Sequence, residues 1–245
     1  MASWPCPKAK REYWAINLSL EKRFSHNWQG GVNYTWSATS GNYGGLWSSD
    51  ENGRQGPNVD RYFDLWFERF DLSGNPLRGF LPSDRSHYFK IFGSYSFPFG
   101  VTVGTVAYGR SGTPRTTMFP INDVTAVPNN YGDLGRLPFL FTADLYAEYT
   151  LKLGKRYAVQ LNATVYNFTN TQTITGYSDT IFQNNSTIYL DYWTLAKQGT
   201  PAGYTLWQSM MLANGSPAPV TNPYYAKWTG RYGAWSMRFG ARFQF

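Results

Sequence analysis

The last fifteen residues of the chain, 231–245, alternate between two kinds of side chain. From Gly233 onward the odd positions are apolar or glycine, and the even positions are small or polar. A period of two indicates a β-strand, because successive side chains point to opposite faces. Large rings lie on one face of this strand, and Arg238 and Arg242 lie on the other. That combination is typical of an outer-membrane barrel strand, which has one face in lipid and the other toward a wet lumen.

Six earlier segments alternate in the same way. They span residues 13–24, 31–39, 86–97, 101–111, 141–153 and 157–168. The pattern is weakest over 101–111, where Gly104, Val106 and Gly109 interrupt it. All of the segments exceed the usual five or six residues of globular strands and suit a tilted crossing of a bilayer.

The connections between these segments alternate in length. Short ones cover 25–28, 98–100 and 154–156, and long ones cover 40–85, 112–140 and 169–230. Membrane barrels have short periplasmic turns and long extracellular loops. The sequence therefore predicts an all-β, antiparallel, up-and-down transmembrane β-barrel segment of about seven long strands, with its last strand descending toward the periplasm.

Seven strands cannot close a membrane barrel on their own. The smallest single-chain barrels have about eight strands, and an open sheet would leave unpaired backbone groups in lipid. The aromatic-rich stretches 62–70 and 187–195 could hide a strand, although loop hairpins or strand extensions above the membrane suit them better. We therefore expect residues 1–10 to be irregular and residues 11–245 to be the C-terminal part of a larger barrel.

The composition agrees with a barrel wall. Aromatic residues make up 19% of the chain and charged residues only 15%, while the mean hydropathy is −0.44. Half of each barrel strand is polar, so the average hides the lipid-facing half. No apolar run reaches the length of a transmembrane helix, and the first residues lack the apolar core of a secretory signal.

The net charge of +7 comes from scattered lysines and arginines. Such dispersion argues against nucleic-acid binding and suits loop cations near lipopolysaccharide phosphates. Cys6 is the only cysteine, so no intramolecular disulfide is possible. The sequence has no catalytic set, phosphate-binding loop or metal-ligand spacing. It therefore predicts no enzyme, no cofactor and no metal.

Five polar residues of the last strands are expected to face the barrel lumen: Asp144, Glu148, Lys152, Arg238 and Arg242. Charges inside a membrane protein usually face its interior. These could line a substrate path, but a satisfied polar network against a plug is the favoured interpretation.

The final eight residues resemble the outer-membrane assembly signal. Its pattern is a polar residue, a glycine two positions later, and hydrophobic residues at the third-last and last positions. Here these are Arg238, Gly240, Phe243 and Phe245. The barrel assembly machinery recruits such a strand by edge pairing, so we expect that machinery to be a partner.

Longer stretches resemble TonB-dependent outer-membrane receptors. Residues 84–100, 109–114, 151–154 and 165–170 are similar, in order and spacing, to hairpins of that family. They are closest to the Oar-like group, which has an N-terminal carboxypeptidase-regulatory-like domain. The resemblance covers about residues 85–245, and 11–39 are compatible with it.

The resemblance implies a bacterial outer-membrane location and a barrel of about 22 strands filled by a plug. It implies that the plug binds TonB and that proton-motive force drives import of a scarce small-molecule or peptide cargo. This chain shows neither a plug nor a TonB box, so the remainder of the receptor becomes an expected partner, alongside outer-membrane lipid and lipopolysaccharide. Two alternatives remain open, namely a complete small barrel acting as porin or adhesin, and a soluble carbohydrate-binding β protein.

Overall fold

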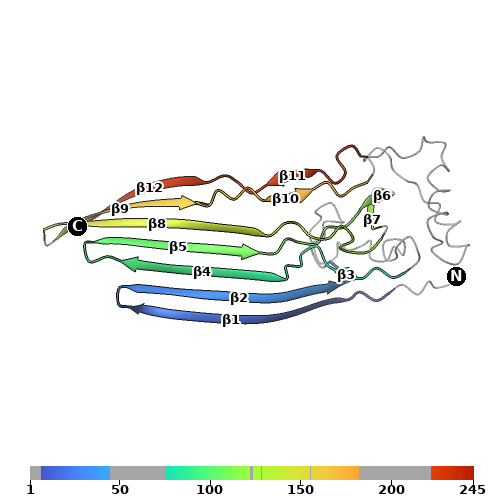
Figure 1. Cartoon of the computed structure of the whole chain (residues 1–245), viewed down its shortest axis with the longest axis horizontal. Coiled ribbons are helices and arrows are strands. Elements are labelled where there is room, and N and C mark those ends of the chain that lie inside the picture. Colours follow the sequence, from blue (N-terminus) through green and yellow to red (C-terminus); the bar gives the residue numbers. More distant parts are fainter. Residues whose placement is uncertain (1–6, 45–74, 122–123, 128, 155, 182–221) are drawn as a thin grey trace, which may run out of the picture.

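The computed structural model describes residues 7–44, 75–121, 124–127, 129–154, 156–181 and 222–245. These residues form antiparallel β-sheets, and the largest sheet contains seven long strands joined in chain order (Figure 1). The long strands are β1 (Arg11–Ser25), β2 (Trp28–Gly41), β4 (His87–Ser96), β5 (Val101–Arg110), β8 (Leu140–Leu153), β9 (Tyr157–Tyr166) and β12 (Ser236–Gln244). The short strand β3 (Gly79–Phe80) pairs with the end of β2. In these ranges no helix has the length and apolar character needed to cross a membrane.

The six segments expected upstream of residue 169 are confirmed as β1, β2, β4, β5, β8 and β9. One of the glycines that weaken the pattern of β5, Gly109, is part of its packing. A Cβ on Gly109 would lie 2.1 Å from the ring of Phe89 on the neighbouring strand, so the glycine makes room for that ring.

The prediction for the last segment is wrong in its extent. The chain is not one strand from 231 to 245, because β11 (Trp228–Arg231) ends and β12 begins only at Ser236. The partner of β12 is β9, which ends at Tyr166 and is followed by Asn167 in the left-handed region with φ 48°. The residues before Ser236 therefore have no extended neighbour on β9, and Tyr232 donates its backbone N–H to Thr173 O instead.

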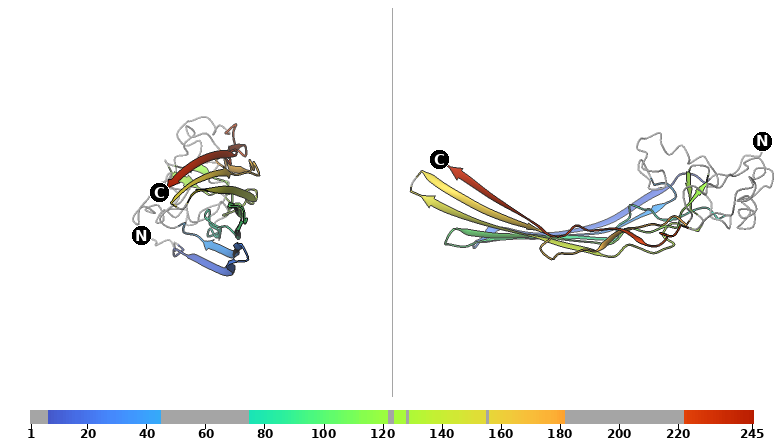
Figure 2. Two further views of the ribbon diagram at one scale, coloured as in Figure 1. Left: turned by 90° about the vertical axis from the view of Figure 1, so that its left-hand side faces the viewer. Right: turned by 90° about the horizontal axis from the view of Figure 1, so that it is seen from above.

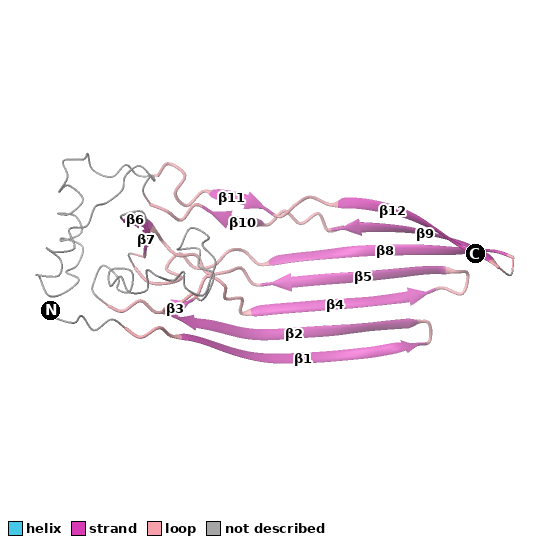
Figure 3. Ribbon diagram, turned by 180° about the vertical axis from the view of Figure 1, so that it is seen from behind, coloured by secondary structure: helices cyan, strands magenta, loops and turns pink. Residues whose placement is uncertain are grey.

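The short connections lie at one end of the sheet and the long ones at the other (Figures 1 and 3). Between β1 and β2 only His26 and Asn27 turn the chain, with φ of 52° and 67°. Two consecutive positive φ angles are those of the tight hairpin turn that matches strand twist. The expected alternation of short and long connections is confirmed.

The long connections contain structure that the sequence did not predict. Two small sheets, β6 (Phe119–Ile121) with β7 (Val124–Ala126) and β10 (Ile174–Tyr177) with β11, lie at the loop end. The fully buried apolar side chains Leu77 and Leu81 also belong to this end. The candidate strands 62–70 and 187–195 fall outside the described residues.

The main sheet is curved, and its strands follow an arc when viewed along their length (left panel of Figure 2). Its hairpins are also staggered. Trp28, Tyr95, Val103, Ala147 and Ala163 form one row of residues that pair directly opposite one another on successive strands. The β1–β2 hairpin ends at this row. The β8–β9 hairpin continues for six more residues beyond it, to the pair Leu153–Tyr157.

This stagger defines a strand tilt. Six residues at about 3.3 Å each span about 20 Å along the strands, and the four strand spacings between the two hairpins span about 19 Å across them. A line through the hairpin tips therefore crosses the strands at about 45°, which is the tilt that strands adopt in membrane barrels.

Candidate functional site: the two faces of the sheet

One face of the sheet is apolar across all seven long strands. Residues paired directly opposite one another share a face, so the register assigns each side chain. The apolar face carries, among others, Trp14, Ile16, Leu18, Leu20, Val32, Trp36, Phe89, Ile91, Tyr95, Val103, Phe141, Leu145, Tyr149, Leu151, Leu161, Val165, Met237, Phe239 and Phe243. Leu20 is 75% exposed and Phe239 is 74% exposed. Within the described ranges no second sheet packs on this face.

The opposite face is polar and more sheltered. On β8, Asp144, Tyr146 and Glu148 are half-buried, whereas Leu145 and Tyr149 on the apolar face are exposed. Side chains converge on the concave side of a curved sheet and splay apart on the convex side. The difference in exposure therefore indicates that the polar face is concave and the apolar face convex.

The five residues expected to face the lumen all lie on this polar face. Asp144, Glu148 and Lys152 lie on β8, and Arg238 and Arg242 lie on β12. Strand β9 runs between them, since Arg238 and Arg242 pair with Thr164 and Gln160 of β9, which pair in turn with Tyr146 and Thr150 of β8. Among the described residues they form no ion pair with one another. Asp144 instead accepts the backbone N–H of Asn167 at 2.8 Å, and Tyr146 donates its hydroxyl to Glu148.

The residues of the assembly-signal pattern lie on the last strand of the sheet order. Arg238 and Gly240 share the polar face, Phe243 lies on the apolar face, and Phe245 extends beyond β12 with 94% of its surface exposed. A Cβ on Gly240 would lie 2.7 Å from Asn162 Oδ1, so the glycine leaves room for that side chain. The edge of β12 opposite β9 has no strand partner in the described part of the chain.

Aromatic rings gather at both ends of the apolar face. Near the hairpins these are Trp28, Tyr95, Phe97, Phe99, Tyr157 and Phe243, and near the long connections they are Trp14, Trp36, Phe89, Phe139 and Phe141. Aromatic girdles of this kind flank the apolar band of membrane barrels. Along β8 the apolar face runs from Phe141 to Leu153. That distance projects to about 28 Å at a tilt of about 45°, close to the usual band of about 25 Å.

Two ion pairs at the loop end were missed by sequence reasoning. The carboxylate of Asp84, which is fully buried, pairs with Arg136 and accepts the backbone N–H of Thr39 at 2.5 Å. Arg115 Nη2 lies 2.5 Å from Asp179 Oδ1, and its guanidinium stacks 3.8 Å from the ring centre of Tyr177. The partners lie 52 and 64 residues apart, so no local pattern could have revealed them.

These pairs join three separate long connections above the sheet. Asp84 precedes β4, Arg136 precedes β8, and Asp179 follows β10. Arg85, beside Asp84, has a lowered pKa, because burial disfavours its charge and the nearby Arg110 repels it. The loop end is therefore a cross-linked, partly buried polar layer.

A second feature that sequence reasoning missed is Lys22. Its position on β1 belongs to the apolar face, since it pairs with Gly30. The period of two that places Leu18 and Leu20 on this face places Lys22 there as well, so the alternation of residues 13–24 could have revealed it.

The described residues contain no cluster of three or more His, Cys, Asp or Glu side chains able to hold a metal ion. The described residues offer two surfaces of opposite chemistry on a single sheet.

No model of a known protein family matches the chain, and no solved structure matches it. Among curated proteins, the chain is similar to the TonB-dependent transporter Oar of Myxococcus xanthus. The two are 31% identical over 175 residues, which is 68% of this chain and 16% of the relative. The match supports a relation to TonB-dependent receptors, of which this chain spans a small part.

Proposed function

We propose that the main sheet forms part of the wall of an outer-membrane barrel belonging to an Oar-like TonB-dependent receptor. The receptor imports a scarce small-molecule or peptide nutrient, and the plug and the TonB box lie outside this sheet. The wall supplies a lipid contact and a lumen lining and carries out no chemical reaction.

The observation that supports this proposal most strongly is the continuity of the two faces over seven strands. Burying a large apolar side chain is worth about 1.5–3 kcal/mol, and more than fifteen such side chains lie on the convex face. A soluble protein rarely exposes so large an apolar surface. Hydrocarbon against the convex face removes that surface from water, and the aromatic ends coincide with the two membrane interfaces.

The arrangement of connections supports an orientation. Short hairpins face the periplasm in bacterial barrels, and long connections face outward. On this proposal the polar layer around Asp84 and Arg115 lies outside the cell, and the concave face lines the lumen against the plug. TonB acts on the plug, while β12 and its terminal aromatic present an edge to the barrel assembly machinery.

Neighbouring residues on β9 provide a direct test. In a background in which Cys6 is replaced by serine, single cysteines at Leu161 on the apolar face and at Gln160 on the polar face carry spin labels. In lipid vesicles we expect the Leu161 label to be relaxed mainly by dissolved oxygen and the Gln160 label mainly by a water-soluble nickel complex. Equal nickel accessibility at both positions, or a folded monomer in buffer without detergent, would contradict the membrane assignment.

A further inference from the structure

The apolar face contains a groove whose floor is a row of small residues. Gly30, Gly93 and Thr105 lie side by side on β2, β4 and β5. One wall is formed by Leu20, Val32 and Ile91, and the other by Trp28, Tyr95 and Val103. The hollow has a volume of about 770 Å³ and is almost entirely apolar.

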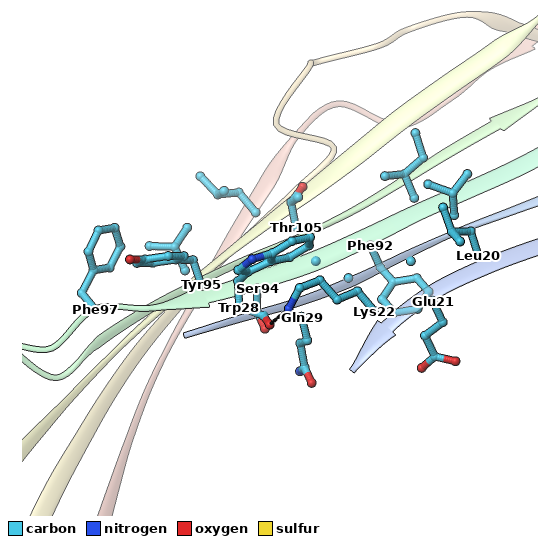
Figure 4. Close-up of a pocket in the computed structure, with 18 residues that line it drawn as sticks. Leu20, Glu21, Lys22, Trp28, Gln29, Phe92, Ser94, Tyr95, Phe97 and Thr105 are labelled. Atoms are coloured by element: carbon cyan, nitrogen blue, oxygen red, sulfur yellow. Dashed lines mark hydrogen bonds between the residues drawn. The ribbon is translucent and has the colours of Figure 1, made fainter. Parts of the chain in front are cut away.

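The groove ends at the only cation on its lining. Lys22 occupies the same row as Gly30, and its ammonium lies 4.0 Å from the ring centre of Trp28 (Figure 4). Nζ also donates to Ser25 Oγ at 2.7 Å, Ser25 O at 3.0 Å and Trp28 O at 3.2 Å. These groups hold the ammonium near the hairpin but carry no negative charge, and no carboxylate pairs with Lys22 in the described part of the chain.

The strand tilt gives the groove a direction. Lys22 is three residues from the end of β1, whereas Leu145, at the opposite end of the same row, is eight residues from the end of β8. The row therefore starts at the hairpin interface and rises toward the middle of the bilayer. An amphipathic molecule that lies along this row would have its polar end at Lys22 and its apolar tail deep in the membrane.

Backbone crowding is milder at Gly93 than at Gly30. A Cβ on Gly93 would lie 3.2 Å from Gln29 O, whereas a Cβ on Gly30 would lie 2.9 Å from Phe92 O. The absence of a side chain at position 93 keeps the floor of the groove open.

We propose that this groove binds one acyl chain of a glycerophospholipid from the periplasmic leaflet, with the lipid phosphate against the ammonium of Lys22. The proposal rests on the membrane orientation given above. Lipopolysaccharide occupies the opposite leaflet, at the aromatic end formed by Trp14 and Phe141, and so does not reach Lys22.

The test uses the full chain folded in octyl glucoside micelles and native mass spectrometry with added phosphatidylglycerol. Gly93→Leu fills the floor and Lys22→Gln removes the charge. Matched controls are Ala163→Leu, on the same face outside the groove, and Lys90→Gln, on the polar face. A neutral galactosyl diacylglycerol replaces the phospholipid in a parallel titration.

We expect Lys22→Gln to weaken phosphatidylglycerol binding about fivefold, since one lysine near a lipid headgroup contributes about 1 kcal/mol. We expect Gly93→Leu to weaken binding as well, because the leucine side chain occupies the floor of the groove. The controls should bind like the wild type, and the neutral lipid should bind more weakly and be indifferent to Lys22→Gln. Lys22→Gln leaves the groove packing intact, so it remains informative if Gly93→Leu does not fold.

Equal phosphatidylglycerol binding by all variants would overturn the lipid site while leaving the barrel assignment intact. Equal binding of both lipids with no effect of Lys22→Gln would overturn the phosphate contact. A chain that stays folded and monomeric in buffer without detergent would overturn the membrane assignment and the lipid site together.

Discussion

At the scale of single residues, several positions are determined by a neighbour on the next strand. Gly109 makes room for the ring of Phe89, and Gly240 makes room for Asn162. Both are explained by cross-strand packing and not by a turn. In β12 the glycine of the assembly-signal pattern therefore has a local structural role, whatever the machinery recognises.

This role predicts the effect of Gly240→Ala. The added methyl group would lie 2.7 Å from Asn162 Oδ1, so the Asn162 side chain must move aside. Because that side chain is half-exposed, the free energy of unfolding in micelles, measured with urea, should fall by less than the roughly 1–3 kcal/mol of an overpacked core.

Asn162→Ala in the same chain should restore most of the lost stability, because it removes the other partner of the clash. Gly233→Ala serves as the control, since a Cβ there meets nothing within 4 Å. Equal effects of Gly240→Ala and Gly233→Ala would show that the clash with Asn162 is not what requires glycine.

At the scale of elements, β12 differs from the other long strands. It lies at the end of the sheet order, with one edge paired to β9. The rings of Phe243 and Tyr157 stack with their centres 5.9 Å apart, and the rings of Phe245 and Phe243 stack with their centres 6.2 Å apart. Phe245 has no place in the ladder of hydrogen bonds, so its contribution to the folded sheet is small.

Because of this placement, we expect Phe245 to contribute to assembly in the membrane and not to the stability of the folded sheet. We expect Phe245→Ala to reduce the amount of protein assembled in the outer membrane several-fold in cells, while its urea midpoint in micelles stays close to that of the wild type. Phe99→Ala, which removes an exposed ring from a hairpin, should leave assembly unchanged. A matching loss of stability in Phe245→Ala would mean that the ring supports the fold and is not a recognition element.

At the scale of the whole molecule, the described residues of the curved sheet enclose no interior of their own. Its buried residues are concentrated at the loop end, where Asp84 and Leu81 are fully buried, and its long strands expose an apolar convex face. The stability of the sheet therefore depends on what covers its convex face. The effect of a charge placed on that face shows whether the covering is lipid or water.

The depth of a charge in the bilayer should determine its effect. On β8, Leu145 lies well inside the apolar band and Leu153 lies at the hairpin end. We expect Leu145→Arg to destabilise the protein in lipid vesicles by about 2–4 kcal/mol and Leu153→Arg by about 0–1 kcal/mol. Gln160→Arg on the polar face is the control, and small, equal effects at Leu145 and Leu153 would indicate that the convex face lies in water.

The strands could be predicted from sequence because alternation is a local property, which β1, β2, β4, β8 and β9 follow closely and β5 follows less regularly. The assignment of faces followed from the same property, so the five expected polar residues fell on one side. The start of β12 could not be predicted, because alternation continues through Gly233 and Trp235, where β9 no longer runs alongside. The short strands β3, β6, β7 and β10 carry too few residues to form a recognisable pattern.

The sequence by itself determined which residues are strands, which side of each strand is apolar, and the alternation of short and long connections. These follow from backbone geometry, which repeats every two residues. Only the tertiary structure decided the register, and through it the tilt, the groove ending at Lys22 and the ion pairs of Asp84 and Arg115. Those features join residues distant in the chain, and their contacts depend on how strands slide past one another, which no local pattern records.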